Sequence, residues 1–120
     1  MHDKKIQMIS EAIFEKKGLD VAVIDLRDVS SITDYFVICT GISSVQTQAI
    51  ADNIARKLKK TYKLIGMEGE ENGLWILLDY SDVLVHVFQP HTREKYALEH
   101  LWADGKITSI EDTNDSIKNK

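Results

Sequence analysis

A glycine and two serines in the segment TGISS, residues 40–44, are the residues of this chain best suited to chemistry. They stand between a predicted strand and a predicted helix. Backbone N–H groups at the N-terminus of a helix, aided by hydroxyl groups, can hold a phosphate group. Serine is also a common residue at the start of a helix, and this simpler explanation is favoured because it needs no further partner.

A catalytic role for this corner would require carboxylates that bind a metal ion. The corner resembles that of nucleotidyltransferases, in which a following strand supplies two or three carboxylates for Mg²⁺. Asp79 and Asp82 are three residues apart, so on a strand they would point to opposite faces, and both are expected in a turn. Glu68 and Glu70 have the right spacing but lie beside an exposed glycine turn. The alternative hypothesis is therefore a nucleotide-binding enzyme that uses Gly41, Ser43, Asp79 and Asp82.

Two further side chains are reactive but lack the neighbours that catalysis requires. Cys39 lies in the apolar run 35–39, and a cysteine nucleophile needs an adjacent base. His86 lies in the apolar run 83–88, and no other histidine stands at a convincing metal-ligand spacing. We interpret Cys39 as a small core residue and His86 as a buried histidine hydrogen-bonded across the sheet. No cofactor and no metal are predicted.

Acidic and aromatic residues gather between positions 68 and 82. A tryptophan beside carboxylates at the edge of a sheet is typical of a surface that binds a basic protein. The aromatic ring supplies contact area, and the charges supply orientation. A core tryptophan with solvated acids is equally compatible with the pattern. The members of this group are Glu68, Glu70, Glu71, Trp75, Asp79, Tyr80 and Asp82.

A run of basic residues stands near the end of one predicted helix. Basic residues in the last turn complement the helix dipole, and a solvated helix face is the usual explanation of such a run. Contact with RNA is the second hypothesis, since clustered cations can bind phosphates. The run consists of Arg56, Lys57, Lys59, Lys60 and Lys63.

Apolar residues at helical spacing predict three helices. Gly18 supplies the left-handed conformation that commonly ends the first helix, and Ser43 or Ser44 caps the second. In the second helix, Val45 begins the apolar stripe that faces the core. The predicted helices cover residues 6–17, 45–62 and 92–102.

Apolar runs predict about five strands, two of which form a central hairpin. The runs 75–78 and 83–88 flank a polar turn, and their composition predicts burial on both faces. A helix joins the second and third strands, so we expect these two strands to be parallel with a right-handed crossover. The remaining strands are predicted at residues 21–26, 35–39 and 64–68.

This order of elements predicts an α/β (α+β) fold, with a single mixed β-sheet of about five strands and flanking helices. A length of 120 residues favours one domain, which we place at residues 1–105. Residues 106–120 are polar apart from three isoleucines, and we expect them to form a flexible C-terminal tail.

Composition and charge limit the class of partner. The formal net charge is −4, so the molecule as a whole has no sequence-independent attraction to nucleic acid. One cysteine cannot form an internal disulfide, and the first residues are polar, unlike a secretory signal. No apolar stretch approaches the roughly 20 residues of a membrane span. These features predict a soluble, cytoplasmic protein in a reducing compartment.

Several segments together resemble the ribosomal silencing factor family, also called the Iojap family. They are SSITDYFVICTGISS at residues 30–44, MEGE at residues 67–70 and WILLDYSDVLVHVF at residues 75–88. The combination of Asp-Tyr-x-Asp-Val, Val-His-Val and a Leu-Glu-x-Leu-Trp ending is specific, and the resemblance covers about residues 6–104. The C-terminal group consists of Arg93, Tyr96, Leu98, Glu99, Leu101 and Trp102.

The resemblance implies a binding protein and not an enzyme. Family members bind a ribosomal protein on the large subunit, at the intersubunit surface where the small subunit docks. They sterically block joining of the two subunits and so repress translation when nutrients are scarce. Their fold is similar to that of nucleotidyltransferases but lacks the catalytic carboxylates, and they tend to form homodimers.

The resemblance also gives the acidic and aromatic group a purpose, because the target surface is basic in the family. The expected partner-binding residues are Glu68, Glu70, Trp75, Leu77, Asp79, Tyr80 and Asp82. Residues expected to hold the core and to fasten the last helix onto the sheet are His86, Arg93, Tyr96, Leu101 and Trp102. A secondary contact with ribosomal RNA is expected through Arg56, Lys57, Lys59 and Lys60.

Overall fold

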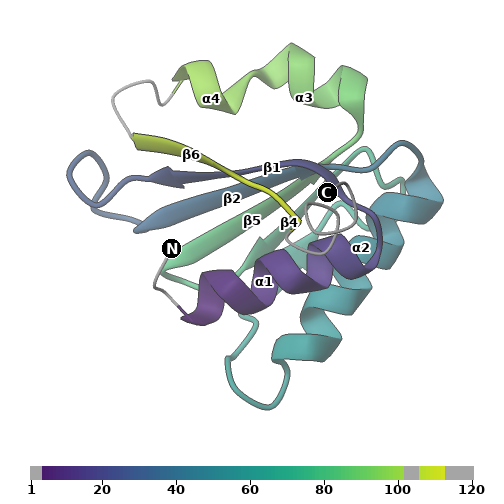
Figure 1. The fold of residues 1–120 in the computed structure, drawn as a ribbon, viewed down its shortest axis with the longest axis horizontal. Coiled ribbons are helices and arrows are strands. Elements are labelled where there is room, and N and C mark those ends of the chain that lie inside the picture. The colour runs from purple at the N-terminus through teal and green to yellow at the C-terminus, as the bar shows by residue number, and fades with distance from the viewer. Residues whose placement is uncertain (1–3, 102–105, 113–120) are drawn as a thin grey trace, which may run out of the picture.

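A computed structural model of the chain contains a mixed six-stranded sheet with helices on both of its faces (Figure 1). The structure describes residues 4–101 and 106–112. Across the sheet the strands follow the order β3-β4-β5-β2-β1-β6. The elements are α1 (Lys4–Glu15), β1 (Leu19–Asp25), β2 (Tyr35–Thr40), α2 (Ser44–Leu58), β3 (Gly66–Glu68), β4 (Trp75–Asp79), β5 (Val83–Phe88), α3 (Pro90–Tyr96), α4 (Leu98–Leu101) and β6 (Lys106–Ile110).

The centre of the sheet is the pairing of β5 with β4 on one side and with β2 on the other. The β4–β5 pair is antiparallel, as the hairpin prediction requires, and the β2–β5 pair is parallel. The prediction that β2 and β3 are parallel is confirmed. The two strands are not adjacent, because β3 pairs with β4, and both β4 and β5 lie between β3 and β2 in the sheet. The hairpin β4–β5 can insert there because its short turn lets two strands fold back together.

The sheet face that α1 and α2 cover, below the sheet in Figure 1, holds the larger core. On this face the side chains of Ile76 and Leu78 from β4 pack with Val85 and Val87 from β5, and all four are fully buried. Helix α2 faces them with Ile50, Ala51, Ile54 and Leu58, which are also buried. No helix in the described part of the chain is long and apolar enough to cross a membrane.

The opposite face carries the smaller core, which α3 and α4 cover (Figure 1). Phe36, Ile38 and Phe88 are buried there against Leu98 of α4, while Trp75 and Leu84 are only half-buried. We call the face covered by α1 and α2 the helix face and the opposite one the open face. Burial in β4 alternates because Ile76 and Leu78 point to the helix face and their neighbours to the open face. The prediction that both faces of β4 are buried is therefore wrong.

The predicted helix ends needed three corrections. Residue Lys17, and not Gly18, adopts the left-handed conformation after α1, with φ 65°. Gly18 is needed for space, because a Cβ atom there would lie 2.2 Å from Cγ2 of Ile13. Helix α2 ends at Leu58, four residues earlier than predicted, and its residue Val45 is exposed and lies off the core stripe.

The C-terminal region differs most from the prediction. The predicted helix over 92–102 is two short helices, which Ala97 separates with a left-handed φ of 46°. Pro90 starts α3 earlier than predicted, since proline is favoured in the first turn of a helix. Residues 106–110, predicted to be flexible, form the sixth strand, antiparallel to β1. Strand β6 is mostly exposed, so its sequence carries little apolar signal.

Candidate protein-docking surface

Four of the predicted partner-binding residues lie together on the open face, at the edge of the sheet formed by β3 and β4. Trp75, Leu77 and Asp79 alternate along β4, so all three point to this face. Glu68 of β3 is directly opposite Leu77 in the antiparallel register, so it shares the face. Glu68 is exposed, and the other three are half-buried. We call Glu68, Trp75, Leu77 and Asp79 the docking surface.

The indole of Trp75 is fixed by one hydrogen bond and two aromatic contacts. Its Nε1 donates a hydrogen bond to Nδ1 of His86, with 3.1 Å between the two nitrogens. The ring of Phe88 lies 4.9 Å away and that of Tyr96 lies 4.8 Å away, centroid to centroid. A large aromatic side chain whose position is fixed loses little conformational entropy when a partner binds. The structure thus holds the half-buried ring of Trp75 in one position.

His86 can accept this hydrogen bond because it is uncharged. Burial lowers the pKa of His86 to about 4, so the neutral imidazole predominates near neutral pH. Its Nδ1 then accepts from Trp75, while Nε2 is buried without a hydrogen-bond partner among the described residues. The histidine therefore connects the core to the docking surface.

The turn between β3 and β4 depends on glycine and is tied to α2. Gly69 has a φ of 87°, and a Cβ atom there would lie 2.0 Å from the carbonyl oxygen of Trp75. The side chain of Gln48 donates to the carbonyl oxygen of Glu70 at 2.8 Å, and Thr47 Oγ1 donates to that of Gly73 at 2.6 Å. Helix α2 thereby fixes the turn and with it the exposed side chain of Glu70, at the end of the docking surface.

Two residues of the predicted partner-binding set are engaged elsewhere, Tyr80 in the core and Asp82, whose side chain stays 45% exposed, in an ion pair. Tyr80 is 2% exposed and packs in the core of the helix face, where burial raises its pKa to about 12. It is therefore not accessible to a partner. Asp82 forms an ion pair with Lys5 of α1. Asp79 remains at the surface, where its carboxylate accepts a hydrogen bond of 2.8 Å from the backbone N–H of Ser81.

The groups that a nucleotidyltransferase-like site would need are already engaged. The backbone N–H of Ile42 donates to Oε1 of Gln46 at 2.7 Å, and Ser43 accepts from the backbone N–H of Gln46 as the N-cap of α2. Asp79 and Asp82 have the separate partners described above. Among residues 4–101 and 106–112, no three His, Cys, Asp or Glu side chains cluster as a metal site. The corner around Gly41 therefore has the geometry of a helix cap.

Cys39 is fully buried in the core of the helix face. Burial raises the pKa of its thiol to about 12. The thiolate is the nucleophilic form of cysteine, so this residue is protonated and inert at neutral pH. It serves as a small core residue.

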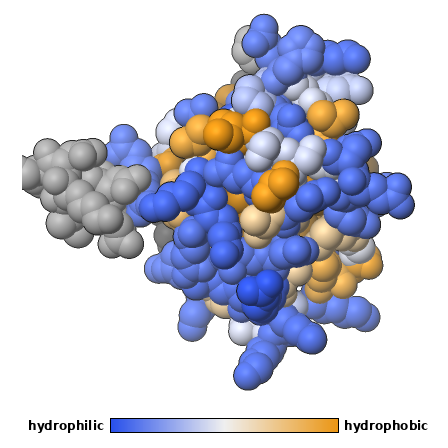
Figure 2. Space-filling model, turned by 90° about the vertical axis from the view of Figure 1, so that its right-hand side faces the viewer, coloured by the Kyte–Doolittle hydropathy of each residue, from blue (hydrophilic) through white to orange (hydrophobic). Residues whose placement is uncertain are grey.

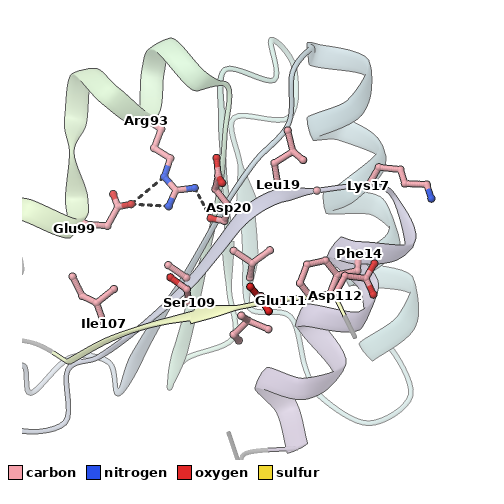
Figure 3. Close-up of a pocket in the computed structure, with 14 residues that line it drawn as sticks. Phe14, Lys17, Leu19, Asp20, Arg93, Glu99, Ile107, Ser109, Glu111 and Asp112 are labelled. Atoms are coloured by element: carbon pink, nitrogen blue, oxygen red, sulfur yellow. Dashed lines mark hydrogen bonds and ion pairs between the residues drawn. The ribbon is translucent and has the colours of Figure 1, made fainter. Parts of the chain in front are cut away.

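A cavity of about 730 Å³ lies between the end of α1, the start of β1, β6 and the α3–α4 region (Figure 3). Arg93 in its wall donates to the carboxylate of Glu99, at 2.6 and 3.1 Å. Its third nitrogen donates to the carbonyl oxygen of Asp20 at 2.7 Å and to Oγ1 of Thr40 at 2.9 Å. Each guanidinium nitrogen thus has a partner, and Arg93 fastens α3 to β1 and β2.

The other residues expected to fasten the last helix differ in their exposure and contacts. Tyr96 is 44% exposed and contributes through a tilted ring contact with Trp75. Trp102 and the side chain of Leu101 lie outside what the structure describes. Leu98, which the sequence interpretation left without a role, is the buried contact of α4 with the sheet. Its place one turn before Leu101 on the same predicted helix was the available signal.

Exposed apolar side chains also occur at the end of the molecule where α2 begins. Ile42 is 69% exposed and Val45 is 77% exposed. Figure 2, which views the side that lies at the right of Figure 1, shows hydrophobic areas that hydrophilic residues separate. Small separate areas of this kind are ordinary on protein surfaces, and we assign them no docking role.

Comparison with known proteins identifies the family. A family model described as "Ribosomal silencing factor during starvation" matches residues 1–120. The chain belongs to this family. Ribosomal silencing factor RsfS of Haemophilus influenzae is 41% identical over 99 residues, which is 82% of this chain and 97% of the relative.

Two further comparisons extend the family relationship. A crystal structure of a protein from Chromobacterium violaceum superposes with a TM-score of 0.82 at 33% identity, covering 91% of this chain and 92% of that one. A more distant mouse relative is named mitochondrial assembly of ribosomal large subunit protein 1. It is 29% identical over 101 residues, which is 81% of this chain and 44% of that protein. The names of the two curated relatives refer to the ribosome, and neither refers to an enzymatic activity.

Proposed function

We propose that this protein represses translation when nutrients are scarce by binding a basic ribosomal protein on the large subunit. The complex would cover part of the surface at which the small subunit docks. Because two bodies cannot occupy one surface, an interface of ordinary size, roughly 800 Å² on each partner, is enough to prevent joining. No catalytic step is required.

The observation that carries the proposal is the composition of the docking surface. It combines a firmly held tryptophan, a half-buried leucine and the carboxylates of Glu68 and Asp79 on one side of a sheet edge. Aromatic side chains supply binding energy in protein interfaces, and carboxylates at the rim favour a basic partner and speed its approach. Glu70 extends the negative charge from the adjoining turn.

The choice of the large subunit rests on the family. The mouse relative is named for assembly of the large ribosomal subunit, and the family description names silencing during starvation. A factor bound to the large subunit could serve both roles if it occupies the intersubunit surface.

The free protein is also proposed to form a homodimer through β6. In the described part of the chain this strand has β1 as a neighbour on one side, and its other side is an open sheet edge. Open edges readily pair with another strand. Sedimentation equilibrium of the free protein tests this proposal, with Thr108→Pro as the variant expected to be monomeric.

Gradient sedimentation with separated ribosomal subunits tests the proposed function. The protein is expected to sediment with large subunits and not with small ones, and to reduce the formation of complete ribosomes from mixed subunits. Glu68→Lys is expected to weaken large-subunit binding about tenfold, because it places a cation against a basic target. The substitution is exposed and leaves the core unchanged.

The matched control is Glu111→Lys, which makes the same charge change near β6, at the opposite edge of the sheet. Equal binding by Glu68→Lys and the unaltered protein would remove the docking surface from the proposal. Failure of the unaltered protein to bind large subunits would overturn the proposal itself. Asp82→Lys is a poor probe, because it would also break the ion pair with Lys5.

A further inference from the structure

The basic residues at the end of α2 form a narrow stripe. Arg56, Lys59 and Lys60 follow the spacing i, i+3 and i+4, which places side chains along one side of a helix, and Lys63 stands three residues further along the chain. All four are exposed. The backbone N–H groups of Thr61 and Tyr62 still bond to the carbonyl oxygen of Leu58, so the coil continues for a turn past the helix.

The structure separates Lys57 from this stripe. Its Nζ lies 3.0 Å from a carboxylate oxygen of Glu15 and 3.9 Å from one of Glu11, both on α1. The pKa of Glu15 is lowered by hydrogen bonds from Asn53 and from Lys57. Lys57 therefore links the two helices and is a poor candidate for an external contact. We replace it in the predicted RNA-contact set with Lys63.

The four stripe residues differ from Lys57 in the described part of the chain. Within residues 4–101 and 106–112, no ion pair or side-chain hydrogen bond engages any of them. They concentrate positive charge at one place on a chain whose net charge is −4. A local cluster that its own protein does not neutralise is available to a negatively charged partner.

The stripe lies near the same sheet edge as the docking surface. The backbone N–H of Ile65, just after the stripe, donates to the carbonyl oxygen of Asp79 at 2.8 Å. At its other end, α2 holds the acidic turn through Gln48. Between Gln48 and Leu58 the helix rises about 15 Å. The acidic turn and the basic stripe thus lie toward opposite ends of α2, near one edge of the sheet.

We propose that the stripe binds the phosphate backbone of ribosomal RNA next to the ribosomal protein that the docking surface recognises. This inference rests on the proposed function and adds a second class of partner. The four members of the stripe are all cationic, and none is an aromatic or apolar anchor of the kind that dominates protein interfaces. Lysine and arginine side chains spaced along one line suit successive phosphates, and they position a protein without reading sequence.

Cross-linking to isolated large subunits identifies the partner class directly. Cys39 is fully buried, so Lys60→Cys carries the one accessible thiol among the described residues and can be labelled with a photoreactive group. We expect this label to attach to ribosomal RNA. The control Lys16→Cys, exposed at the end of α1, is expected to give little cross-linking. Attachment of the label at position 60 to ribosomal protein alone would overturn the proposal.

Salt dependence of binding measures the number of phosphate contacts. Each contact contributes about 0.9 to the slope of log affinity against log salt concentration, so Lys60→Gln/Lys63→Gln should lower the slope by nearly two. When the salt concentration is raised fourfold, the affinity for large subunits falls in both proteins. The factor by which it falls should be about ten times smaller for this variant than for the unaltered protein. Both residues follow the end of α2 at Leu58, so the helix stays intact.

The matched control is Lys4→Gln/Lys16→Gln, which removes two exposed charges at α1 and should leave the slope unchanged. Equal slopes for the two double variants would overturn the RNA contact. If the unaltered protein binds large subunits and Glu68→Lys weakens that binding, such a result would leave the proposed function standing. Absence of any large-subunit binding would overturn both proposals.

Discussion

The two faces of the sheet differ in how completely helices cover them and in the type of side chain they carry. The helix face is closed by two long helices, and most of its β-strand side chains are aliphatic and buried. The open face is covered by two short helices and carries Trp75, His86, Phe36 and Phe88 in contact with one another. One face stabilises the fold, and the other places an aromatic and acidic surface where a partner can reach it.

The difference shows how adjacent residues of one strand acquire separate roles. Successive side chains of β4 point in opposite directions, so a single strand supplies both the core and the docking surface. Any shift of one residue in the β4–β5 register would exchange the two sets. The buried residues of β4 therefore fix the orientation of the exposed ones.

Substitution of two neighbouring leucines should separate stability from binding. Leu78→Ala removes a fully buried side chain on the helix face and is expected to lower the free energy of unfolding by about 2–5 kcal/mol. Leu77→Ala, on the open face, should cost about 1 kcal/mol or less but weaken large-subunit binding. Urea denaturation and gradient sedimentation measure the two effects. Equal destabilisation by both substitutions would contradict the division between the faces.

Acid should weaken the open face through His86. The histidine has an ordinary pKa of 6.5 when unfolded and about 4 when folded, so only the unfolded chain binds the proton between these values. Stability is then independent of this group above pH 6.5 and falls by up to about 3 kcal/mol as the pH drops toward 4. Urea denaturation at several pH values measures the slope. His86→Phe should flatten it, and an unchanged slope in this variant would assign the loss to other groups.

Substitution of Gly69 in the turn between β3 and β4 should lower the stability of the protein. Gly69→Ala forces a side chain into a positive φ and against the carbonyl oxygen of Trp75. We expect a loss of about 1–3 kcal/mol, together with a change in tryptophan fluorescence as Trp75 shifts. Gly66→Ala is the control, since a Cβ atom there meets nothing within 4 Å. A comparable loss in the control would show that β3 tolerates no substitution at all.

Loss of the α2 cap should have the smallest effect. Ser43→Ala removes the acceptor for the backbone N–H of Gln46 and is expected to cost about 1 kcal/mol. Thermal denaturation measures it, with Ser31→Ala in the exposed loop before β2 as the control. Large-subunit binding should be unchanged, because Ser43 lies apart from the docking surface. Impaired binding at unchanged stability would indicate that the cap region contacts the partner.

The sequence predicted the elements well where the apolar signal was strong. The runs over β2 and β5 were located to within one residue, and Ser43 was one of the two serines proposed as the cap. The sequence did not predict β6, because the residues of this strand are mostly exposed and form a strand only by pairing with β1. It also missed the break at Ala97, because an alanine gives no sign of a left-handed conformation.

The predicted partner-binding residues divide according to the direction of their side chains. Glu68, Trp75, Leu77 and Asp79 share a face because their positions alternate and pair in register. Tyr80 follows Asp79 directly but turns into the core, which its aromatic character and polar neighbours could not reveal. Lys57 likewise differs from Lys59 and Lys60 only through its contact with α1, a distant segment of the chain.

The sequence by itself determined the family, the order of the main elements and the residue types available for docking, because apolar spacing and local motifs encode these directly. The tertiary structure decided which of those residues are accessible. The glycine-serine corner at residues 40–44 is a helix cap because its polar groups form hydrogen bonds with Gln46 and with the backbone of the turn between β3 and β4. Accessibility depends on contacts between distant segments, such as α1 with α2 and β3 with β4. No local pattern specifies those contacts.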